Sequence, residues 1–402
     1  MRRPRRQPEV AKLTVRDALL TDKRCFVRVD YNVPMRGKEI ASDARIRASI
    51  PTIQYLVDQG AKVVLASHLG RPGGKVVEEL RMDDVARRLE GLLGRPVAKL
   101  DDCIGPGVEA FVAKMNPGDV VLLENVRFYP GEENNDPEIA RKMASLADVF
   151  VNDAFGTAHR AHASTAGIAA FIPAYAGFLM EKEVEALGKL LRGPKRPFTA
   201  VIGGAKVSDK LNVLKNLLDK VDALLLGGGM ANTFLIAEGH SIGKSLAEPA
   251  MVDSAREILD KARRLGVALL LPTDVVVASA AETGTPVRVV LAGEIPRDMS
   301  ALDIGPATRR RYSEKILTSR TVFWNGPMGV FEVEPFRGGT MEVAGAMASL
   351  KGFTVVGGGD SLAAMEMSGV AGKISHLSTG GGASLEFLEG RTLPGVACLK
   401  DK

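Results

Sequence analysis

The sequence has few aromatic residues, few cysteines and no long apolar run, and each scarcity excludes a class of protein. No run of about 18 apolar residues is present, so no membrane-spanning helix is predicted. Cys25, Cys103 and Cys398 are odd in number and widely separated, which argues against a disulfide framework or a clustered zinc site. We therefore predict a soluble protein of a reducing cytoplasm.

Most of the excess positive charge lies at one end of the chain. The formal net charge is +5, which by itself raises the hypothesis of a nucleic-acid partner. Four of the positive charges lie in the first six residues: Arg2, Arg3, Arg5 and Arg6. An export signal requires an apolar stretch after such charges, and none follows here. The rest of the chain is nearly neutral. We predict a solvated tail and neither a nucleic-acid nor a membrane partner; a nucleic-acid-binding protein relying on this tail is kept as an alternative.

Apolar runs alternate with helical patterns along the whole chain. A chain of 402 residues exceeds what one hydrophobic core usually supports, so two domains are expected. Runs such as Val120 to Leu123 are apolar throughout, which is typical of strands buried on both faces of a parallel sheet. A helical stretch followed by Gly193, Pro194 and Pro197 indicates the domain boundary. The predicted fold class is α/β, with two open parallel-sheet, Rossmann-like, three-layer domains joined by a linking helix and a hinge.

In the first half, the predicted strand ends carry cationic and polar side chains. They are Arg28, Asp30, Asn32, His68, Arg71, Arg127, His159, Arg160 and His162. Open α/β sheets bind ligands at the carboxyl ends of their strands, and arginine suits phosphate or carboxylate. The set predicts a pocket for a small, multiply charged anion. The alternatives are ordinary surface charges, satisfied core histidines, or a zinc site at His159 and His162, which lacks nearby cysteine or carboxylate partners.

In the second half, the predicted strand ends carry glycine. Four junctions occur: VIGGAKVSDK, ALLLGGGMANTF, TVVGGGDSLAAM and LSTGGGASLEF. Glycine lets backbone N–H groups approach phosphate oxygens, and a following helix adds its dipole, so a nucleotide polyphosphate is predicted. Lys206 and Lys210, one helical turn apart, would point towards the phosphates unless they belong to an ordinary amphipathic helix. Asp360 is placed to hold Mg²⁺, with an N-cap as the alternative or additional role.

The common nucleotide motifs are absent. EGHSIGKS resembles a P-loop, but Glu238 stands where the first glycine is required. The triple-glycine runs do not complete a dinucleotide-binding pattern, because Asn232, Leu362 and Leu385 occupy its last position. An NAD-dependent dehydrogenase on an α/β fold therefore remains only as an alternative.

Nine motifs together resemble the phosphoglycerate kinase family in order and spacing, from about Leu13 to the C-terminus. They are RVDYNVP, SHLGRP, LLENVRF, NDAFGTAHRAHAST, GGAKVSDK, LDIGP, WNGPMGVFE, GGGDS and STGGGASLEFLEG. The resemblance implies Mg²⁺-dependent phosphoryl transfer between 1,3-bisphosphoglycerate and ADP, giving 3-phosphoglycerate and ATP, in glycolysis. It also implies a monomer with small-molecule substrates.

The resemblance implies a role for residues across both domains. The substrate site would comprise Asp30, Asn32, Arg45, His68, Leu69, Gly70, Arg71, Arg127 and Arg160. The nucleotide site would comprise Lys206, Lys210, Gly228, Gly229, Leu302, Asn325, Glu332, Gly358, Gly359, Asp360 and Ser361. Gly203, Gly204, Gly381 and Gly382 would stabilise phosphate, while Lys210 and Arg45 would be catalytic. Glu332 would hold the ribose and Asp360 the Mg²⁺ of MgATP. Ala301 departs from the glycine that many members carry near the adenine.

The implied domain plan divides the chain into five parts. They are a basic tail over 1–12, an N-terminal 3-phosphoglycerate domain over 13–180, a linking helix over 181–196, a nucleotide domain over 197–375, and a segment over 376–402 that returns to the N-terminal domain. A closing motion about the linking helix would bring the two substrates together.

Overall fold

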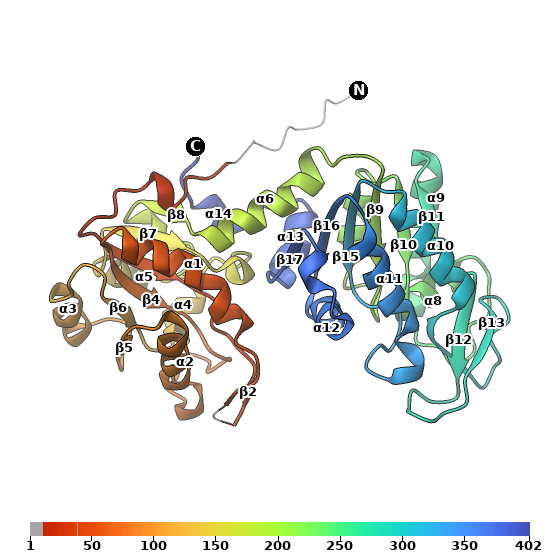
Figure 1. Cartoon of the computed structure of the whole chain (residues 1–402), viewed down its shortest axis with the longest axis horizontal. Helices are drawn as coiled ribbons and strands as arrows, with labels where there is room; N and C mark the ends of the chain where they lie inside the picture. The colour runs from red at the N-terminus through yellow and green to blue at the C-terminus, as the bar shows by residue number, and fades with distance from the viewer. Residues whose placement is uncertain (1–10, 38) are drawn as a thin grey trace. The chain divides into compact units, whose positions relative to one another are not determined.

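The computed structural model describes residues 11–37 and 39–402 (Figure 1). Most of the predicted basic tail lies outside the described residues. The chain divides into two compact units: a first unit of residues 1–185 with 392–402, and a second unit of residues 186–391. No helix in the described part of the chain is both long and apolar enough to span a lipid bilayer.

A six-stranded parallel sheet forms the centre of the first unit, in the order β5-β6-β4-β1-β7-β8. The strands are β1 (Arg24–Arg28), β4 (Lys62–Ala66), β5 (Ala98–Lys99), β6 (Val120–Leu122), β7 (Val149–Asn152) and β8 (Ala174–Ala176). β1 and β4 are buried except at their first residues, and β6 and β7 are buried throughout, which explains their apolar sequences. A small hairpin pairs β2 (Met35–Arg36) with β3 (Glu39–Ile40).

Helices connect the strands of the first unit. They are α1 (Ala44–Asp58), α2 (Asp83–Leu93), α3 (Pro106–Ala113), α4 (Pro130–Glu133), α5 (Pro137–Ala144) and α14 (Pro394–Ala397). Short 3₁₀ turns are η1 (Val15–Asp17), η2 (Glu78–Leu80), η3 (Val126–Phe128), η4 (Phe155–Thr157) and η5 (Gly167–Ala170). Local sequence sets several ends: Asp136 accepts hydrogen bonds from two N–H groups of α5, and α2 ends at Gly94, whose φ is 63°.

The second unit has its own six-stranded parallel sheet, in the order β11-β10-β9-β15-β16-β17. Its strands are β9 (Phe198–Ile202), β10 (Ala223–Leu226), β11 (Ala268–Leu270), β15 (Thr321–Asn325), β16 (Phe353–Gly357) and β17 (His376–Ser378). The two parallel sheets confirm the predicted α/β class. A three-stranded antiparallel sheet of β12 (Asp274–Ala278), β13 (Arg288–Leu291) and β14 (Ser300–Ile304) was not predicted.

The helices of the second unit are α7 (Leu211–Leu217), α8 (Gly228–Ala237), α9 (Val252–Leu265), α10 (Pro306–Leu317), α11 (Gly338–Ser349), α12 (Gly359–Ser368) and α13 (Gly382–Leu388), with 3₁₀ turns η6 (Pro249–Met251), η7 (Glu334–Phe336) and η8 (Ala371–Lys373). Three of these helices, α8, α10 and α12, begin two residues after a strand ends. Trp324 and Tyr312 are fully buried in the core that these helices cover.

Helix α6 (Phe178–Arg192) contains the boundary between the two units, which falls after Glu185. Its first turn is held by Asp153, whose Oδ1 accepts hydrogen bonds from the N–H groups of Leu179 (2.9 Å) and Met180 (3.3 Å). The linking helix was expected over 181–196, and the helix in the structure starts earlier and ends before the proline-rich breaker. The segment 376–402 was assigned to the first domain, but β17 pairs with β16, and only 392–402 belongs to the first unit.

Candidate active site

The polar residues predicted in the first half follow four strands that are neighbours in the sheet. Asp30 and Asn32 follow β1, His68 to Arg71 follow β4, Arg127 follows β6, and Arg160 follows β7. β6, β4, β1 and β7 are adjacent and parallel, so their carboxyl ends share one edge. Topology alone brings together residues that are more than 100 positions apart.

Arg45 is brought to this edge by α1. Its Nη1 donates to Asp30 Oδ2 (3.1 Å) and to the carbonyl of Asn32 (3.0 Å). The side chain of Asn32 accepts a hydrogen bond from the N–H of Gly70 (2.9 Å). Asp30 and Asn32 therefore orient Arg45 and the 68–71 loop. Unaided sequence reasoning did not single out Arg45, because a lone arginine in a helix carries no local signal.

Arg127 is held by a network of polar groups at the end of β6. Its Nη1 donates to the carbonyl of Gly70 (2.9 Å), and its N–H donates to Asn125 Oδ1 (3.1 Å). The Nδ2 of Asn125 donates to the carbonyls of Leu69 (2.7 Å) and Leu80 (3.0 Å). Asn125 thus joins Arg127 to the loop that carries His68 and Arg71.

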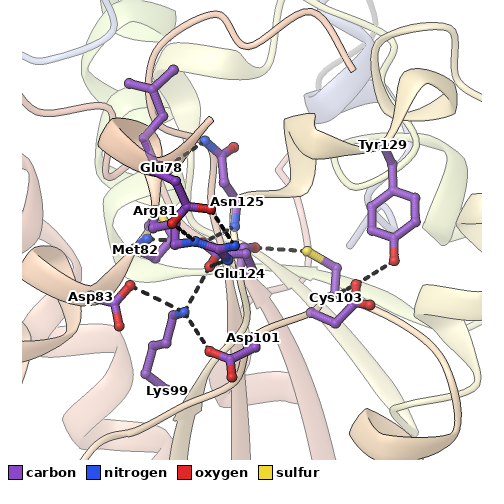
Figure 2. Close-up of polar contacts among 12 residues, drawn as sticks. Glu78, Arg81, Met82, Asp83, Lys99, Asp101, Cys103, Glu124, Asn125 and Tyr129 are labelled. Atoms are coloured by element: carbon purple, nitrogen blue, oxygen red, sulfur yellow. Dashed lines mark hydrogen bonds and ion pairs between the residues drawn. The ribbon is translucent and has the colours of Figure 1, made fainter. Parts of the chain in front are cut away.

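Glu124 holds Asn125 and neighbouring segments through hydrogen bonds (Figure 2). Its Oε1 accepts hydrogen bonds from the N–H groups of Met82 and Asn125, both 2.9 Å, and its Oε2 accepts from Arg81 (3.0 Å) and Lys99 (2.8 Å). Glu124 is almost completely buried, and these four donors compensate for its desolvation. Glu124 and Asn125 were not predicted from the sequence. Two polar residues directly after a buried apolar run were the available signal.

Other members of the cationic set lie differently. Arg28 was predicted as a ligand-facing cation, but it is 1% exposed and donates to backbone carbonyls and to His68. Arg71 is exposed, and the Nε of Arg160 donates to His159 Nε2 (3.1 Å). No group of three potential metal-ligating side chains occurs among the described residues, so the zinc alternative at His159 and His162 gains no support.

The electrostatics of this site favour an anion. Burial lowers the pKa of His68 well below its ordinary value, and the charges of Arg28, Arg127, Arg45 and Arg160 lower it further. Burial and the neighbouring arginines also lower the pKa of His162 to about 4. Both histidines are therefore neutral near pH 7, and the positive charge of the site is carried by arginine.

The second unit contains a cavity of about 450 Å³. This volume falls within the range of roughly 300 to 1,000 Å³ that is typical of small-molecule sites. Its lining includes the apolar residues Leu246, Pro272, Val275, Leu302, Ile304 and Val330, and the glycines Gly204, Gly228, Gly229 and Gly329, with Glu332 and Asp360. Ala301 also lines it. A lining of apolar residues and glycines suits a nucleotide, because its base favours apolar contacts and its phosphates approach backbone closely at glycine.

Glycines in and beside the cavity lining permit close packing of three backbone segments. At Gly203 a Cβ would lie 2.1 Å from the carbonyl oxygen of Pro327. At Gly228, whose φ is +67°, a Cβ would lie 2.6 Å from the carbonyl oxygen of Gly204. At Gly326, whose φ is +92°, it would lie 2.2 Å from the carbonyl oxygen of Gly203. No side chain fits at these positions without movement of the backbone.

One detail of the predicted phosphate cradle is corrected. The N–H groups of Gly203 and Gly204 were expected to face phosphate, but they donate to the carbonyls of Asn325 (2.9 Å) and Pro327 (3.0 Å). The N–H of Gly228 likewise donates to the carbonyl of Met328 (3.0 Å). These three glycines therefore shape the wall of the cavity through close packing, and their N–H groups bind carbonyls of the chain itself. Gly381 and Gly382 have open space where a side chain would stand and do not line the cavity.

Lys210 lies just before α7, so it does not share a helical turn with Lys206 as predicted. Its Nζ donates to the carbonyls of Gly203 (2.6 Å) and Asn325 (3.2 Å), whereas Lys206 is exposed. Burial lowers the pKa of Lys210 to about 8, and the charges of Asp360 and Asp209 oppose this effect. The ammonium form therefore predominates at neutral pH.

Asp360 is in the first turn of α12 and is exposed at the cavity. It is not the N-cap, which is Gly358, with a φ of 95°. Gly358 packs against Asn325, whose Nδ2 donates to the carbonyl of Gly357 (2.7 Å). Ser361 is buried and accepts a hydrogen bond from the N–H of Gly326 (2.6 Å). Asn325 and Ser361 thus support the walls, and Asp360 offers a carboxylate to a ligand.

Comparison with known proteins assigns this arrangement to a family. The phosphoglycerate kinase family profile matches residues 15–391. The chain belongs to the phosphoglycerate kinase family. It is 60% identical over 393 residues to the phosphoglycerate kinase of Moorella thermoacetica, covering 98% of this chain and 100% of the relative. It is 58% identical to that of Pelotomaculum thermopropionicum, with the same coverage.

Solved phosphoglycerate kinases share the fold. The structure from Coxiella burnetii superposes with a TM-score of 0.89 at 44% identity, covering 96% of this chain and 98% of that chain. The structure from Pyrococcus horikoshii gives a TM-score of 0.84 at 36% identity, with the same coverage. The chain is thus a phosphotransferase with a carboxyl group as acceptor, and its general role is the phosphoglycerate kinase step of glycolysis.

Proposed function

We propose that the two substrates of this phosphoglycerate kinase are divided between the two units. The first unit binds 3-phosphoglycerate or 1,3-bisphosphoglycerate at the edge shared by β6, β4, β1 and β7. The observation that carries this proposal is the convergence of Arg45, Arg127, Arg160 and His68 from separate segments at one sheet edge. Phosphate and carboxylate groups are the ligands that such a cluster of guanidinium groups favours.

The cavity of the second unit binds ATP or ADP. Its apolar part, around Leu302 and Val330, suits the base, and Glu332 lies on the lining where it can accept hydrogen bonds from ribose hydroxyls. The glycine-rich part admits phosphates close to the backbone. Lys210 stands beside this part, with its ammonium group on the carbonyls of Gly203 and Asn325.

Asp360 is the residue that fits a magnesium ion shared with the nucleotide. Mg²⁺ is usually held by one or two carboxylates together with phosphate oxygens and water, not by a cage of protein ligands. Asp360 and Glu332 both have exposed carboxylates on the cavity lining, and the charge of Asp360 acts on the nearby Lys210, which supports its assignment to the phosphate side. The ion would supply positive charge that neutralises the nucleotide phosphates.

The residues of both units stabilise charge and position the reactants. In the ATP-consuming direction the nucleophile is the carboxylate of 3-phosphoglycerate, which is ionised at neutral pH and needs no general base. Arg45 and Lys210 supply positive charge to the transferring phosphoryl group. Since the two sites lie on different units, transfer requires closure about α6, which excludes water. Closure, a monomeric state and a cytoplasmic location stay predictions.

A crossed binding experiment tests the division. Calorimetric titration would measure 3-phosphoglycerate and MgADP separately on Arg45→Lys and Asp360→Asn. We expect Arg45→Lys to weaken 3-phosphoglycerate binding by about tenfold, because the planar fork is lost, with MgADP unchanged. We expect Asp360→Asn to weaken MgADP by about tenfold but not metal-free ADP.

Two matched variants serve as controls. Arg47→Lys alters an exposed arginine of the same helix α1, and Glu366→Gln alters an exposed acid of the same helix α12. Neither is expected to change either affinity. If Arg45→Lys or Asp360→Asn weakened the binding of both ligands equally, or of neither, the proposed division of the sites would be refuted.

A further inference from the structure

Arg28 occupies a buried position beside the substrate site that no ligand-binding role explains. It ends β1, and its Nη1 donates to the carbonyls of Val29 (2.6 Å) and Ala66 (3.3 Å). Its Nη2 lies 3.1 Å from Nδ1 of His68, which is itself 4% exposed. The guanidinium is thus fixed by two carbonyls and meets one defined nitrogen of the imidazole.

The chemistry of this pair decides the protonation of His68. A guanidinium has only N–H donors and no acceptor, so the hydrogen bond requires an unprotonated Nδ1. The remaining proton of the neutral ring is then on Nε2. We propose that Arg28 is a positioning residue that holds His68 in the neutral Nε2–H tautomer, so that His68 meets the anionic substrate as an uncharged hydrogen-bond donor. The second half of this proposal rests on the proposed substrate site.

The other two forms of His68 are disfavoured by the same geometry. In the Nδ1–H tautomer and in the imidazolium, a proton on Nδ1 would point at an N–H of Arg28, so that two donors would meet. The imidazolium would also place a second buried positive charge next to Arg28 and near Arg127, Arg45 and Arg160, which lowers the pKa of His68. Neither partner can turn away easily, because Arg28 is 1% exposed and bound to two carbonyls.

The backbone of His68 is fixed as well. Ser67 Oγ donates to the carbonyl of His68 (3.2 Å) and accepts a hydrogen bond from the N–H of Tyr31 (2.8 Å). The residue is thus held by its main chain and by Nδ1, which leaves Nε2 as the nitrogen that can serve a ligand. A fixed tautomer costs no proton rearrangement when the substrate binds.

Nitrogen NMR of the wild-type protein tests the tautomer directly. Long-range ¹H–¹⁵N correlation spectra of histidine-labelled protein would be recorded from about pH 5 to pH 8, with His68→Gln used to assign the signal. We expect one protonated nitrogen, Nε2, and an unprotonated Nδ1 throughout this range, since the ordinary pKa of about 6.5 is strongly lowered. An imidazolium or an Nδ1–H pattern at pH 7 would overturn the proposal.

Arg28→Met tests the cause, because methionine keeps much of the length and offers no donor. We expect the ¹⁵N shifts of the two ring nitrogens to move towards each other as both tautomers become populated. The KM for 3-phosphoglycerate should rise by about tenfold while the KM for MgATP stays constant. Arg24→Met, at the other end of the same strand, is the matched control and should leave the His68 signal unchanged. An unchanged His68 pattern in folded Arg28→Met would refute the role of Arg28; if this variant does not fold, the wild-type spectrum decides.

A titration separates this inference from the proposed function. If 3-phosphoglycerate binds and shifts the Nε2 signal of wild-type His68, both hold. If it binds without any effect on that signal, the donor role of His68 and its place in the substrate site are refuted. The NMR measurement of the tautomer still tests the role of Arg28 in that case.

Discussion

The two proposed sites of this protein are built for anions in opposite ways. In the first unit the proposed anion site consists of long side chains that are held by other side chains, as Arg127 is by Glu133 and Arg45 is by Asp30. In the second unit the proposed phosphate site consists of backbone, and what matters at Gly203 and Gly228 is the absence of a side chain.

The difference shows where each site is sensitive. A side-chain site depends on hydrogen-bond partners, because an arginine has many rotamers and must be held in one of them. A backbone site depends on close packing of loops, because the segments around Gly203, Gly228 and Gly326 approach within the distance that one methyl group would occupy. We therefore expect binding at the side-chain site to be weakened by removal of a hydrogen-bond partner, and binding at the backbone site to be weakened by a substitution that adds a carbon atom.

The largest effect is expected from Lys210→Ala, which removes a buried positive charge beside the glycines of the second site. Turnover should fall on the order of 10³-fold or more, because a positive charge near the transferring phosphoryl group is removed. A coupled assay of ATP-dependent phosphorylation of 3-phosphoglycerate, followed by NADH oxidation, measures it. Lys215→Ala, a partly exposed lysine in α7 that pairs with Glu257, is the control. A loss below about tenfold would remove Lys210 from the mechanism.

A smaller effect is expected from Gly228→Ala. The added Cβ would meet the carbonyl oxygen of Gly204 at 2.6 Å in a left-handed backbone conformation, so the loops must separate. We expect the KM for MgATP to rise by roughly tenfold to a hundredfold, with the KM for 3-phosphoglycerate unchanged. Gly345→Ala, in α11 with open space around it, should change neither KM. Normal nucleotide binding by Gly228→Ala would show that close packing of the backbone does not define this site.

The smallest effect is expected from Asn125→Ala in the side-chain site. It removes the hydrogen bonds to the carbonyls of Leu69 and Leu80 and to the N–H of Arg127. The KM for 3-phosphoglycerate should rise by about fivefold to tenfold, because Arg127 and the 68–71 loop lose their common anchor. Asn134→Ala, an exposed asparagine in the same unit, is the control. A lower melting temperature with both KM values unchanged would show that Asn125 acts on stability alone.

Parts of this architecture could be predicted because they depend on local sequence. Buried runs such as Val120 to Leu122 predicted parallel strands, and glycine-rich strand ends predicted the wall of the nucleotide cavity. The antiparallel sheet of β12, β13 and β14 was missed, although β12 (DVVVA) and β13 (RVVL) are apolar runs, because such runs do not reveal the direction in which strands pair. Local pattern also misled at Lys206, because α7 begins only at Leu211.

The sequence by itself determined the α/β class, the expectation of two domains and, through its ordered motifs, the family and its reaction. The tertiary structure decided what each residue does at the sites. It placed Arg28 in the interior against His68 Nδ1, gave Glu124 and Asn125 their anchoring contacts, and showed that the N–H groups of Gly203 and Gly204 bind carbonyls. The physical reason is that strand and helix patterns are local, whereas a hydrogen-bond partner from another strand is set only when the sheet order brings distant segments together.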